Sequence, residues 1–171
     1  DMKVTLRSAT GHGSTFRVEI PQELVVPAPA AGTSRIGSTK ANAAHDGDPL
    51  HVIVIDDDAD ARTSLALVLE LWGHSVSCAE HAAAAVNDCR QRGVTPDAII
   101  SDFQLGSGRT GVEEITHLRR TFDTALPALV VSGAHDAETR AAAEAVDAAY
   151  LTKPVRPLRL KSWLSAVRPR K

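Results

Sequence analysis

The stretch HVIVIDDD at residues 51–58 decides the fold of this chain. Strands of a parallel sheet are covered on both faces, so they read as short runs of apolar, mostly β-branched residues, and HVIVI at 51–55 has this pattern in the four residues after His51. The acidic residues that follow would lie at the carboxyl end of such a strand, which is the edge where open α/β sheets hold their sites. The stretch therefore predicts a buried strand that leads into an acidic site.

The chain repeats this alternation of strand and helix after residue 58. Four further apolar runs follow: HSVSCA at 74–79, DAIIS at 97–101, ALVVS at 128–132 and AAYLT at 148–152. Apolar residues between these runs recur with helical spacing, as in Leu65, Val68 and Trp72. Parallel strands need crossover connections, and right-handed crossovers place helices on both faces of a sheet. Residues 50–169 are therefore expected to form one doubly wound α/β domain with a five-stranded parallel sheet.

The first 49 residues have a different composition. The runs MKVTLRSA and STFRVEIP are β-like and are joined by a Gly-containing turn, so residues 1–21 predict a β-hairpin. Residues 22–49 are rich in Ala, Pro, Gly, Ser and Thr and predict a flexible linker. The chain starts at Asp1 without a signal-peptide pattern, and we expect it to be a piece of a longer, cytoplasmic protein.

Composition limits the classes of partner. Hydrophobic residues make up 43% and charged residues 23% of the chain, the formal net charge is -2, and no run approaches the roughly 18 apolar residues that a membrane span needs. We therefore expect no nucleic-acid partner and no membrane contact by this segment. Cys78 and Cys89 suggest neither a disulfide framework nor a zinc ribbon. A metal site at His74, Cys78 and His81 is disfavoured, because a strand through Cys78 would scatter the three side chains.

Polar side chains of the kinds that phosphoryl transfer requires follow four of the five predicted strands. They are Asp56 and Asp57, Asp102, Ser132 and Lys153. Converging carboxylates repel one another unless a cation lies among them, and an oxygen-rich site suits Mg²⁺. An Asp at such a site can attack phosphorus, while the metal, a Lys and a small hydroxyl meet the charge of the transferred group. Each residue alone reads as a turn, cap or surface residue, and Asp58 is expected to cap a helix. Together they predict phosphoryl chemistry.

The motifs VIDDD, IISDFQL, VVSG and YLTKP occur in this order across residues 51 to about 168. Their sequence resembles the response-regulator receiver domain, the phosphoacceptor of two-component signalling. The resemblance implies the flavodoxin-like strand order 2-1-3-4-5. It also implies that Asp102 is the phosphoacceptor. The Mg²⁺ ligands that it implies are Asp56, Asp57, Asp102 and the backbone carbonyl of Gln104.

The same resemblance assigns roles at later positions. Lys153 would pair with the phosphoryl group, Ser132 would be the switch hydroxyl, and Tyr150 would be the switch aromatic. Their response to phosphorylation would change the face formed by the fourth helix, the fifth strand and the fifth helix of the domain. The loop QLGSGRTG at 104–111 is one residue longer than the common family pattern and lacks its usual Pro, so the resemblance does not give its path.

The stretch LRSATGHGSTFRVEIP at 6–21 resembles the end of a histidine-kinase ATP-binding domain, whose last Gly box reads G-x-G-S-x-F. In this interpretation Gly11 and Gly13 are the remnant of an incomplete ATP site, and we expect no ATP binding by this chain. Kinase tail, linker and receiver is the order of a hybrid histidine kinase. The implied partners are the histidine-kinase core, in cis or in trans, and a histidine phosphotransfer protein.

Two other functions remain open from the residues. An aspartate-nucleophile phosphohydrolase also places an Asp after its first strand, but DADAR at 58–62 breaks the D-x-D-x-T/V pattern of such enzymes. A receiver-like interaction domain that works without phosphorylation would have lost an acid or the Lys, and none is lost. In the leading interpretation the chain catalyses only its own phosphorylation and dephosphorylation.

Overall fold

The computed structural model describes residues 3–9, 13–19, 48–106, 108–133 and 137–169. These residues belong to two units, Asp1–Thr39 and Lys40–Lys171. The first unit contains an antiparallel hairpin of strands β1 (Lys3–Ala9) and β2 (Gly13–Glu19), as the sequence predicts. Gly11 and most of the predicted linker lie outside the described residues.

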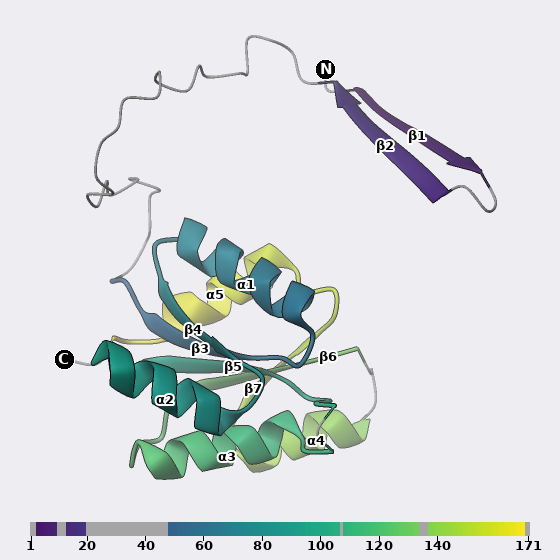
Figure 1. Cartoon of the computed structure of the whole chain (residues 1–171). Coiled ribbons are helices and arrows are strands. Elements are labelled where there is room, and N and C mark those ends of the chain that lie inside the picture. Colours follow the sequence, from purple (N-terminus) through teal and green to yellow (C-terminus); the bar gives the residue numbers. More distant parts are fainter. Residues whose placement is uncertain (1–2, 10–12, 20–47, 107, 134–136, 170–171) are drawn as a thin grey trace, which may run out of the picture. The chain divides into compact units, whose positions relative to one another are not determined.

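The second unit alternates strands with helices along the chain. Its strands are β3 (His51–Ile55), β4 (Ser75–Ala79), β5 (Ala98–Asp102), β6 (Ala128–Ser132) and β7 (Ala149–Thr152). Its helices are α1 (Ala59–Leu71), α2 (Ala82–Arg92), α3 (Gly111–Thr121), α4 (Ala137–Ala145) and α5 (Pro157–Ala166). The strands are all parallel in the order β4-β3-β5-β6-β7, which is 2-1-3-4-5 within this unit. The predicted doubly wound sheet is confirmed (Figure 1).

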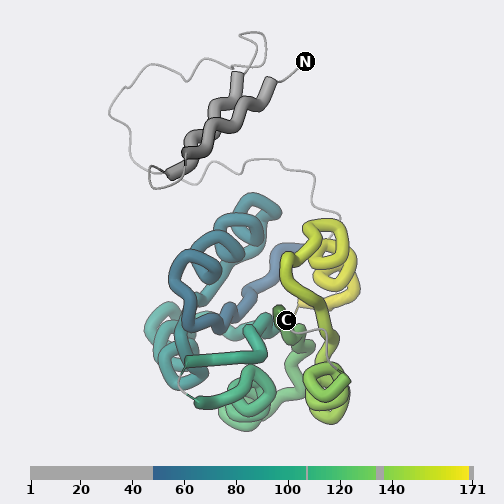
Figure 2. Tube along the Cα trace, turned by 90° about the vertical axis from the view of Figure 1, so that its right-hand side faces the viewer, coloured from purple at the N-terminus to yellow at the C-terminus, as the bar shows by residue number. Residues whose placement is uncertain are grey.

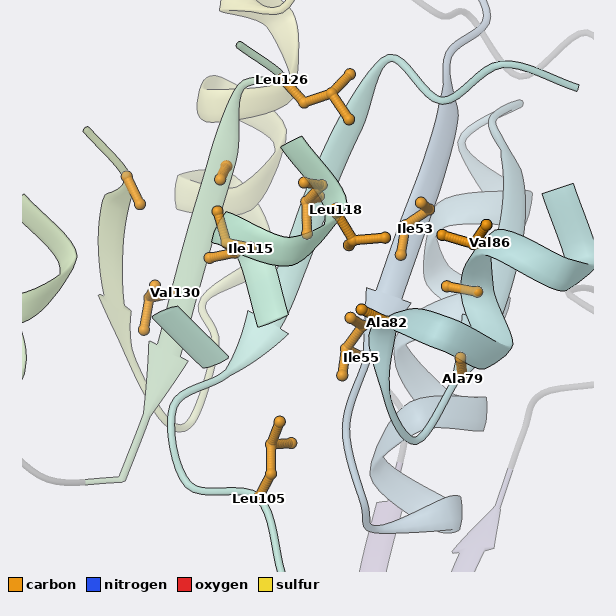
Figure 3. Close-up of a cluster of buried hydrophobic side chains, with 14 of the residues drawn as sticks. Ile53, Ile55, Ala79, Ala82, Val86, Leu105, Ile115, Leu118, Leu126 and Val130 are labelled. Atoms are coloured by element: carbon orange, nitrogen blue, oxygen red, sulfur yellow. The ribbon is translucent and has the colours of Figure 1, made fainter. Parts of the chain in front are cut away.

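Helices cover both faces of the sheet, α1 and α5 on one and α2, α3 and α4 on the other (Figures 1 and 2). Successive strand residues point to opposite faces, so β3 contributes to two cores. Val52 and Val54 pack with side chains of α1 and α5. Ile53 and Ile55 pack with side chains of α2 and α3 (Figure 3). Burial on both faces explains the apolar run of β3.

Local sequence signals set the ends of several helices. The Asp58 side chain accepts hydrogen bonds from the backbone N–H groups of Asp60 and Ala61, so it caps α1 as predicted. Thr110 and Glu113 form a capping box at the start of α3. Gly93 ends α2 in the left-handed conformation, with φ of 62°, where glycine carries no steric cost. The starts of α1 and α3 are therefore set by capping side chains, and the end of α2 by a glycine that adopts the left-handed conformation.

The histidine and cysteine cluster that the sequence analysis disfavoured is dispersed in the structure. The buried His74 accepts a hydrogen bond from the Leu50 N–H at its Nδ1 atom, over 3.2 Å. His81 caps α2 through its own Nδ1, and Cys78 is a free, exposed thiol on β4. None of the helices in the described part of the chain has the length and apolar character needed to cross a membrane.

Candidate functional site

Three carboxylates meet at the carboxyl edge of the sheet. Asp56 and Asp57 follow β3, and Asp102 ends β5, the strand hydrogen-bonded to β3. One carboxylate oxygen from each of the three lies within 4.8 Å of the others. The fold thus brings together acids from two strands that are far apart in the sequence.

Asp56 is the most enclosed of the three acids, with 7% of its surface exposed. Its Oδ1 atom accepts a hydrogen bond of 2.9 Å from the Asp58 N–H. Burial, reinforced by the negative charge of Asp102, raises the pKa of Asp56 above its ordinary value, although the Asp58 N–H and Lys153 oppose the rise. A cation beside this carboxyl group therefore stabilises its ionised form.

Lys153 supplies one such cation from the other end of the chain. It follows β7, and its Nζ atom lies 2.8 Å from Oδ2 of Asp102 and 3.4 Å from Oδ2 of Asp56. Burial alone would lower the pKa of Lys153, but the hydrogen bond and charge of Asp102, with those of Asp56, raise it above the ordinary lysine value. The ammonium group is held in its charged form beside the carboxylates.

The other predicted site residues surround this group. Ser132 ends β6, is 1% exposed, and accepts a hydrogen bond of 2.8 Å at its carbonyl oxygen from the Lys153 N–H. Tyr150 lies on β7 with its ring half-buried beneath the guanidinium of Arg140, whose central carbon is 5.5 Å from the ring centre. Gln104 follows Asp102 by two residues and is exposed. Its backbone forms an isolated antiparallel β-bridge with Thr110.

The loop after β5, whose path the sequence did not give, is tied to the site at two places. The Gly106 N–H donates a hydrogen bond of 3.0 Å to Oδ2 of Asp57. At the loop's end Gly111 packs directly on strand β5: a Cβ atom there would lie 2.0 Å from the carbonyl oxygen of Asp102 and 2.7 Å from the Ser101 hydroxyl. The absence of a side chain at Gly111 therefore allows α3 to start against the backbone of Asp102.

Arg62 is a site residue that the sequence analysis missed. It lies on the first turn of α1, and its guanidinium donates to the backbone carbonyl of Asp56. Its side chain is 15% exposed and also forms an ion pair of 3.6 Å with Glu80. No sequence signal distinguishes this Arg from others on amphipathic helices, because its target is a backbone atom.

The donor set fits a magnesium ion. Hard carboxylate oxygens are the ligands that Mg²⁺ prefers, and the ion keeps several waters when few protein ligands hold it. The structure offers three such carboxylates close together, and Asp57 is open to solvent. Their mutual repulsion is only partly offset by Lys153, so a divalent cation is favoured among them.

An apolar cavity of about 330 Å³ opens beside these acids. Asp56, Asp102 and Lys153 form its polar end. Its walls come from α1 and from the chain around the start of α5, and they include Leu65, Val68, Pro154, Val155 and Leu160. An apolar surface therefore lies next to the cluster of carboxylates.

Comparison with known families and proteins agrees with this geometry. Residues 52–165 match the family described as response regulator receiver domain. The chain is 32% identical over 119 residues to the phosphate regulon transcriptional regulatory protein PhoB of Escherichia coli, an overlap of 68% of this chain and 50% of PhoB. It is 34% identical over 121 residues to the sensor histidine kinase AruS of Pseudomonas aeruginosa, an overlap of 71% of this chain and 11% of AruS. The matches thus span half or less of these relatives.

Solved structures give the same picture of the fold. The chemotaxis protein CheY4 of Vibrio cholerae is 25% identical, with a TM-score of 0.60, over 70% of this chain and 99% of that one. A response regulator of Chloroflexus aurantiacus is 28% identical, with a TM-score of 0.57, over 69% of this chain and 99% of that one. Both overlaps cover nearly the whole length of the solved chain.

Proposed function

Because this chain belongs to the response regulator receiver domain family, and so contains a receiver domain of two-component systems, we propose that Asp102 is its phosphoacceptor. The observation that carries the proposal is the 2.8 Å contact between Lys153 and Asp102 within the cluster of three acids. In this proposal the oxygen that attacks phosphorus, a positively charged group and the ligands of a metal lie close together. Phosphoryl transfer needs these three components together.

In the proposed reaction a carboxylate oxygen of Asp102 attacks the phosphorus of a phosphohistidine. A P–O bond forms, the P–N bond breaks, and its electron pair leaves with the imidazole nitrogen, which takes up a proton. Lys153, already beside Asp102, would then contact a phosphoryl oxygen. Asp56, Asp57 and Asp102, with the carbonyl of Gln104, would hold Mg²⁺, which when bound supplies charge neutralisation at the phosphoryl oxygens.

The proposed response to phosphorylation involves Ser132 and Tyr150. Ser132 ends the strand beside β5, and its carbonyl holds the Lys153 N–H. Its hydroxyl would follow the new phosphoryl group, and the Tyr150 ring on β7 would move inward with it. The surface of α4, β7 and α5 would then present a different arrangement of side chains to partners.

The proposed phosphodonor is a histidine kinase core or a histidine phosphotransfer protein. The apolar cavity beside Asp102 and Lys153 supports a protein donor, because the carrier of a phosphohistidine could bury apolar side chains there. We further propose that residues 1–21 are the end of a histidine-kinase ATP-binding domain, 22–49 a linker and 50–169 the receiver. A part of the sensor histidine kinase AruS is similar to this chain over 121 residues, which supports the proposal that a receiver of this kind can belong to a histidine kinase.

Phosphorylation with a small donor such as acetyl phosphate tests the proposal. With Mg²⁺ the parent chain should gain one acid-stable, base-labile phosphoryl group, and chelation of Mg²⁺ should abolish the gain. Asp102→Asn should remain unlabelled, whereas the control Asp123→Asn, at a positive-φ turn after α3, should label like the parent. Equal labelling of Asp102→Asn would make the assignment wrong, and sustained turnover of phosphate esters would favour a phosphohydrolase.

Limited proteolysis tests the proposed domain boundaries. Cleavage should occur within residues 22–49 and leave a resistant fragment of about residues 50–169. Cleavage inside the receiver at comparable protease concentrations would contradict these boundaries.

Titration with ATP and Mg²⁺ should show no saturable binding, since an isolated Gly turn cannot enclose a triphosphate.

A further inference from the structure

Arg62, on the first turn of α1, contacts two loops at the carboxyl edge of the sheet. Its Nη1 atom donates a hydrogen bond to the backbone carbonyl of Asp56, directly after β3. Its Nη2 atom lies 3.6 Å from a carboxylate oxygen of Glu80, in the loop between β4 and α2. One guanidinium group thus connects the segment that carries two of the three clustered acids to the neighbouring loop.

The carbonyl that accepts this hydrogen bond belongs to the peptide group between Asp56 and Asp57. A peptide group is planar, so the direction of its C=O bond fixes the orientation of the whole group. The Cα atoms that carry the two carboxylate side chains are the two ends of that group. A donor that holds the Asp56 carbonyl therefore restricts the backbone rotations that set the relative direction of the two carboxylates.

The other polar groups of Asp56 have partners of a different kind. Its N–H donates to the Ala79 carbonyl over 3.3 Å, and its Oδ1 atom accepts from the Asp58 N–H over 2.9 Å. Both partners are backbone groups, which a side-chain substitution leaves in place. Its Oδ2 atom lies 3.4 Å from Nζ of Lys153, a group that we propose to act in phosphoryl transfer. Arg62 is therefore the partner whose side chain can be changed without altering either the backbone or the proposed reaction.

The charge of Arg62 by itself disfavours a metal ion among the acids. Like charges repel, so a guanidinium group near a site for a divalent cation lowers the affinity of that site. The Arg62 side chain is mostly buried, with 15% of its surface exposed, and salt screens a buried charge less than an open one. Lys153 already supplies a positive charge to the acids. The geometry of Arg62, and not its charge, is therefore what can aid the binding of a cation.

We propose that Arg62 is a positioning residue for the divalent cation, and that it orients the peptide group between Asp56 and Asp57 so that both carboxylates can hold one ion. A guanidinium group suits this role because its N–H donors are fixed in one plane and reach both acceptors together. The proposal rests on the proposed function in one respect, namely that Mg²⁺ binds at these acids. It gives Arg62 no contact with the ion or with the phosphoryl group.

Direct binding of Mn²⁺ to the full chain, measured by electron paramagnetic resonance of the free ion with Mg²⁺ as competitor, tests the proposal without phosphorylation. Arg62→Met keeps an apolar stem but offers no donor, and it should weaken Mn²⁺ binding roughly tenfold. Arg62→Lys should also weaken it, since an ammonium group keeps the charge but not the planar fork. Glu80→Gln should change it little, because the Glu80 side chain is 67% exposed. The matched control Arg90→Gln, on the exposed side of α2, should bind like the parent.

The direction of the change in Mn²⁺ affinity separates three roles. Tighter binding by Arg62→Met would show that only the charge of Arg62 acts on the site, and it overturns the proposal. An unchanged affinity with a lower urea midpoint overturns it in favour of a purely structural role. Circular dichroism and urea unfolding without metal will verify that each variant is folded where binding is measured. If Arg62→Met does not fold, Arg62→Lys carries the test, and a parental affinity of that variant overturns the proposal.

A second experiment separates this proposal from the proposed function. The rate of labelling by acetyl phosphate is measured against the concentration of Mg²⁺. Arg62→Met should need more Mg²⁺ to reach half of its maximal rate, whereas its rate at saturating Mg²⁺ should approach that of the parent. A lower maximal rate at an unchanged half-saturating concentration would assign Arg62 to the phosphoryl group and overturn the positioning role. Failure of Asp102 to accept phosphate contradicts the proposed function and leaves the Mn²⁺ result standing.

Discussion

The ammonium nitrogen of Lys153 lies 2.8 Å from Oδ2 of Asp102, although the two residues are separated by 51 positions and two strands carry them to the same edge of the sheet. The contact is a charge-assisted hydrogen bond. The Asp102 side chain is largely shielded from water, with 12% of its surface exposed. Lys153 therefore holds the proposed nucleophile in a single orientation.

Substitution of Lys153 by Gln should slow phosphorylation of Asp102 by acetyl phosphate by roughly 10²-fold, because a preorganised positive charge next to the transferred group is lost. Initial rates with radiolabelled donor will measure the effect at saturating Mg²⁺. Lys161→Gln is the matched control, since it removes a lysine of α5 that does not line the site. Similar rates for both variants would contradict the role proposed for Lys153.

Substitution of Gly111 by Ala should destabilise the domain by about 1–3 kcal/mol, the usual cost of overpacking. The new Cβ would lie 2.0 Å from the carbonyl oxygen of Asp102, so α3 or the end of β5 must move. Urea unfolding will measure the loss. Gly133→Ala is the control because, among the described residues other than its chain neighbours, none has an atom within 4 Å of the Cβ position there. A parent-like midpoint for Gly111→Ala would show that α3 does not pack as described.

Glu114 and Arg109 form an ion pair of 3.2 Å in which the two partners should contribute unequally to stability. The Glu114 side chain is 1% exposed and accepts a hydrogen bond from the Ala82 N–H at the start of α2, whereas the Arg109 side chain is 61% exposed. Glu114→Leu should therefore cost about 1–3 kcal/mol, because it leaves a buried N–H unpaired. Arg109→Gln should cost less than about 1 kcal/mol, since water replaces an exposed partner.

Urea unfolding of both variants will test this asymmetry. A larger loss for Arg109→Gln than for Glu114→Leu would mean that the ion pair, and not the hydrogen bond to α2, carries the stabilisation. Glu113→Gln serves as a reference for a neighbouring carboxyl group that is exposed and whose hydrogen bonds to other described residues are those of the capping box.

His51 should make the stability of the domain depend on pH. Its ring is buried between β3 and β4, with Nδ1 2.7 Å from the Ser75 hydroxyl and Nε2 2.9 Å from that of Ser77. Burial, assisted by the positive charge of Arg92, lowers the pKa of His51 below its ordinary value, while Asp97 acts in the opposite direction. The folded state therefore favours the neutral imidazole.

The sign of the effect follows from linkage. As pH falls below about 6.5, the ordinary histidine value, the unfolded chain takes up the proton first and stability declines until His51 also protonates in the folded state. Urea midpoints at pH 7.5 and 5.5 should show a smaller decline in His51→Gln than in the parent. His117→Gln, at an exposed position of α3, should keep the parental decline. An equal decline in all three proteins would assign the pH dependence to other groups.

The order and type of the elements follow from local patterns in the sequence. The apolar residues of β3 indicate a strand that is buried on both faces. The helical spacing of apolar residues in α1 indicates the side of the helix that packs on the sheet. Asp58 and Gly93 mark helix ends because capping depends on residues within one turn. The sequence also indicated which polar residues lie together. In open α/β sheets the site lies at the carboxyl ends of the strands, and Asp102 and Lys153 both follow strands at that edge. The strand order came from family resemblance and not from the residues.

The tertiary structure alone decided the contacts between distant elements. Arg62 bonds to the backbone of Asp56, and the N–H of Gly106 bonds to Asp57. Arg140 on α4 and Arg159 on α5 share one hollow. None of these has a local signature, because periodicity reports which face of an element is buried and not which element covers it. The crossovers between strands set those distances. Local sequence patterns therefore determined the fold and the residues that we propose to react, while three-dimensional packing determined which distant groups support the site.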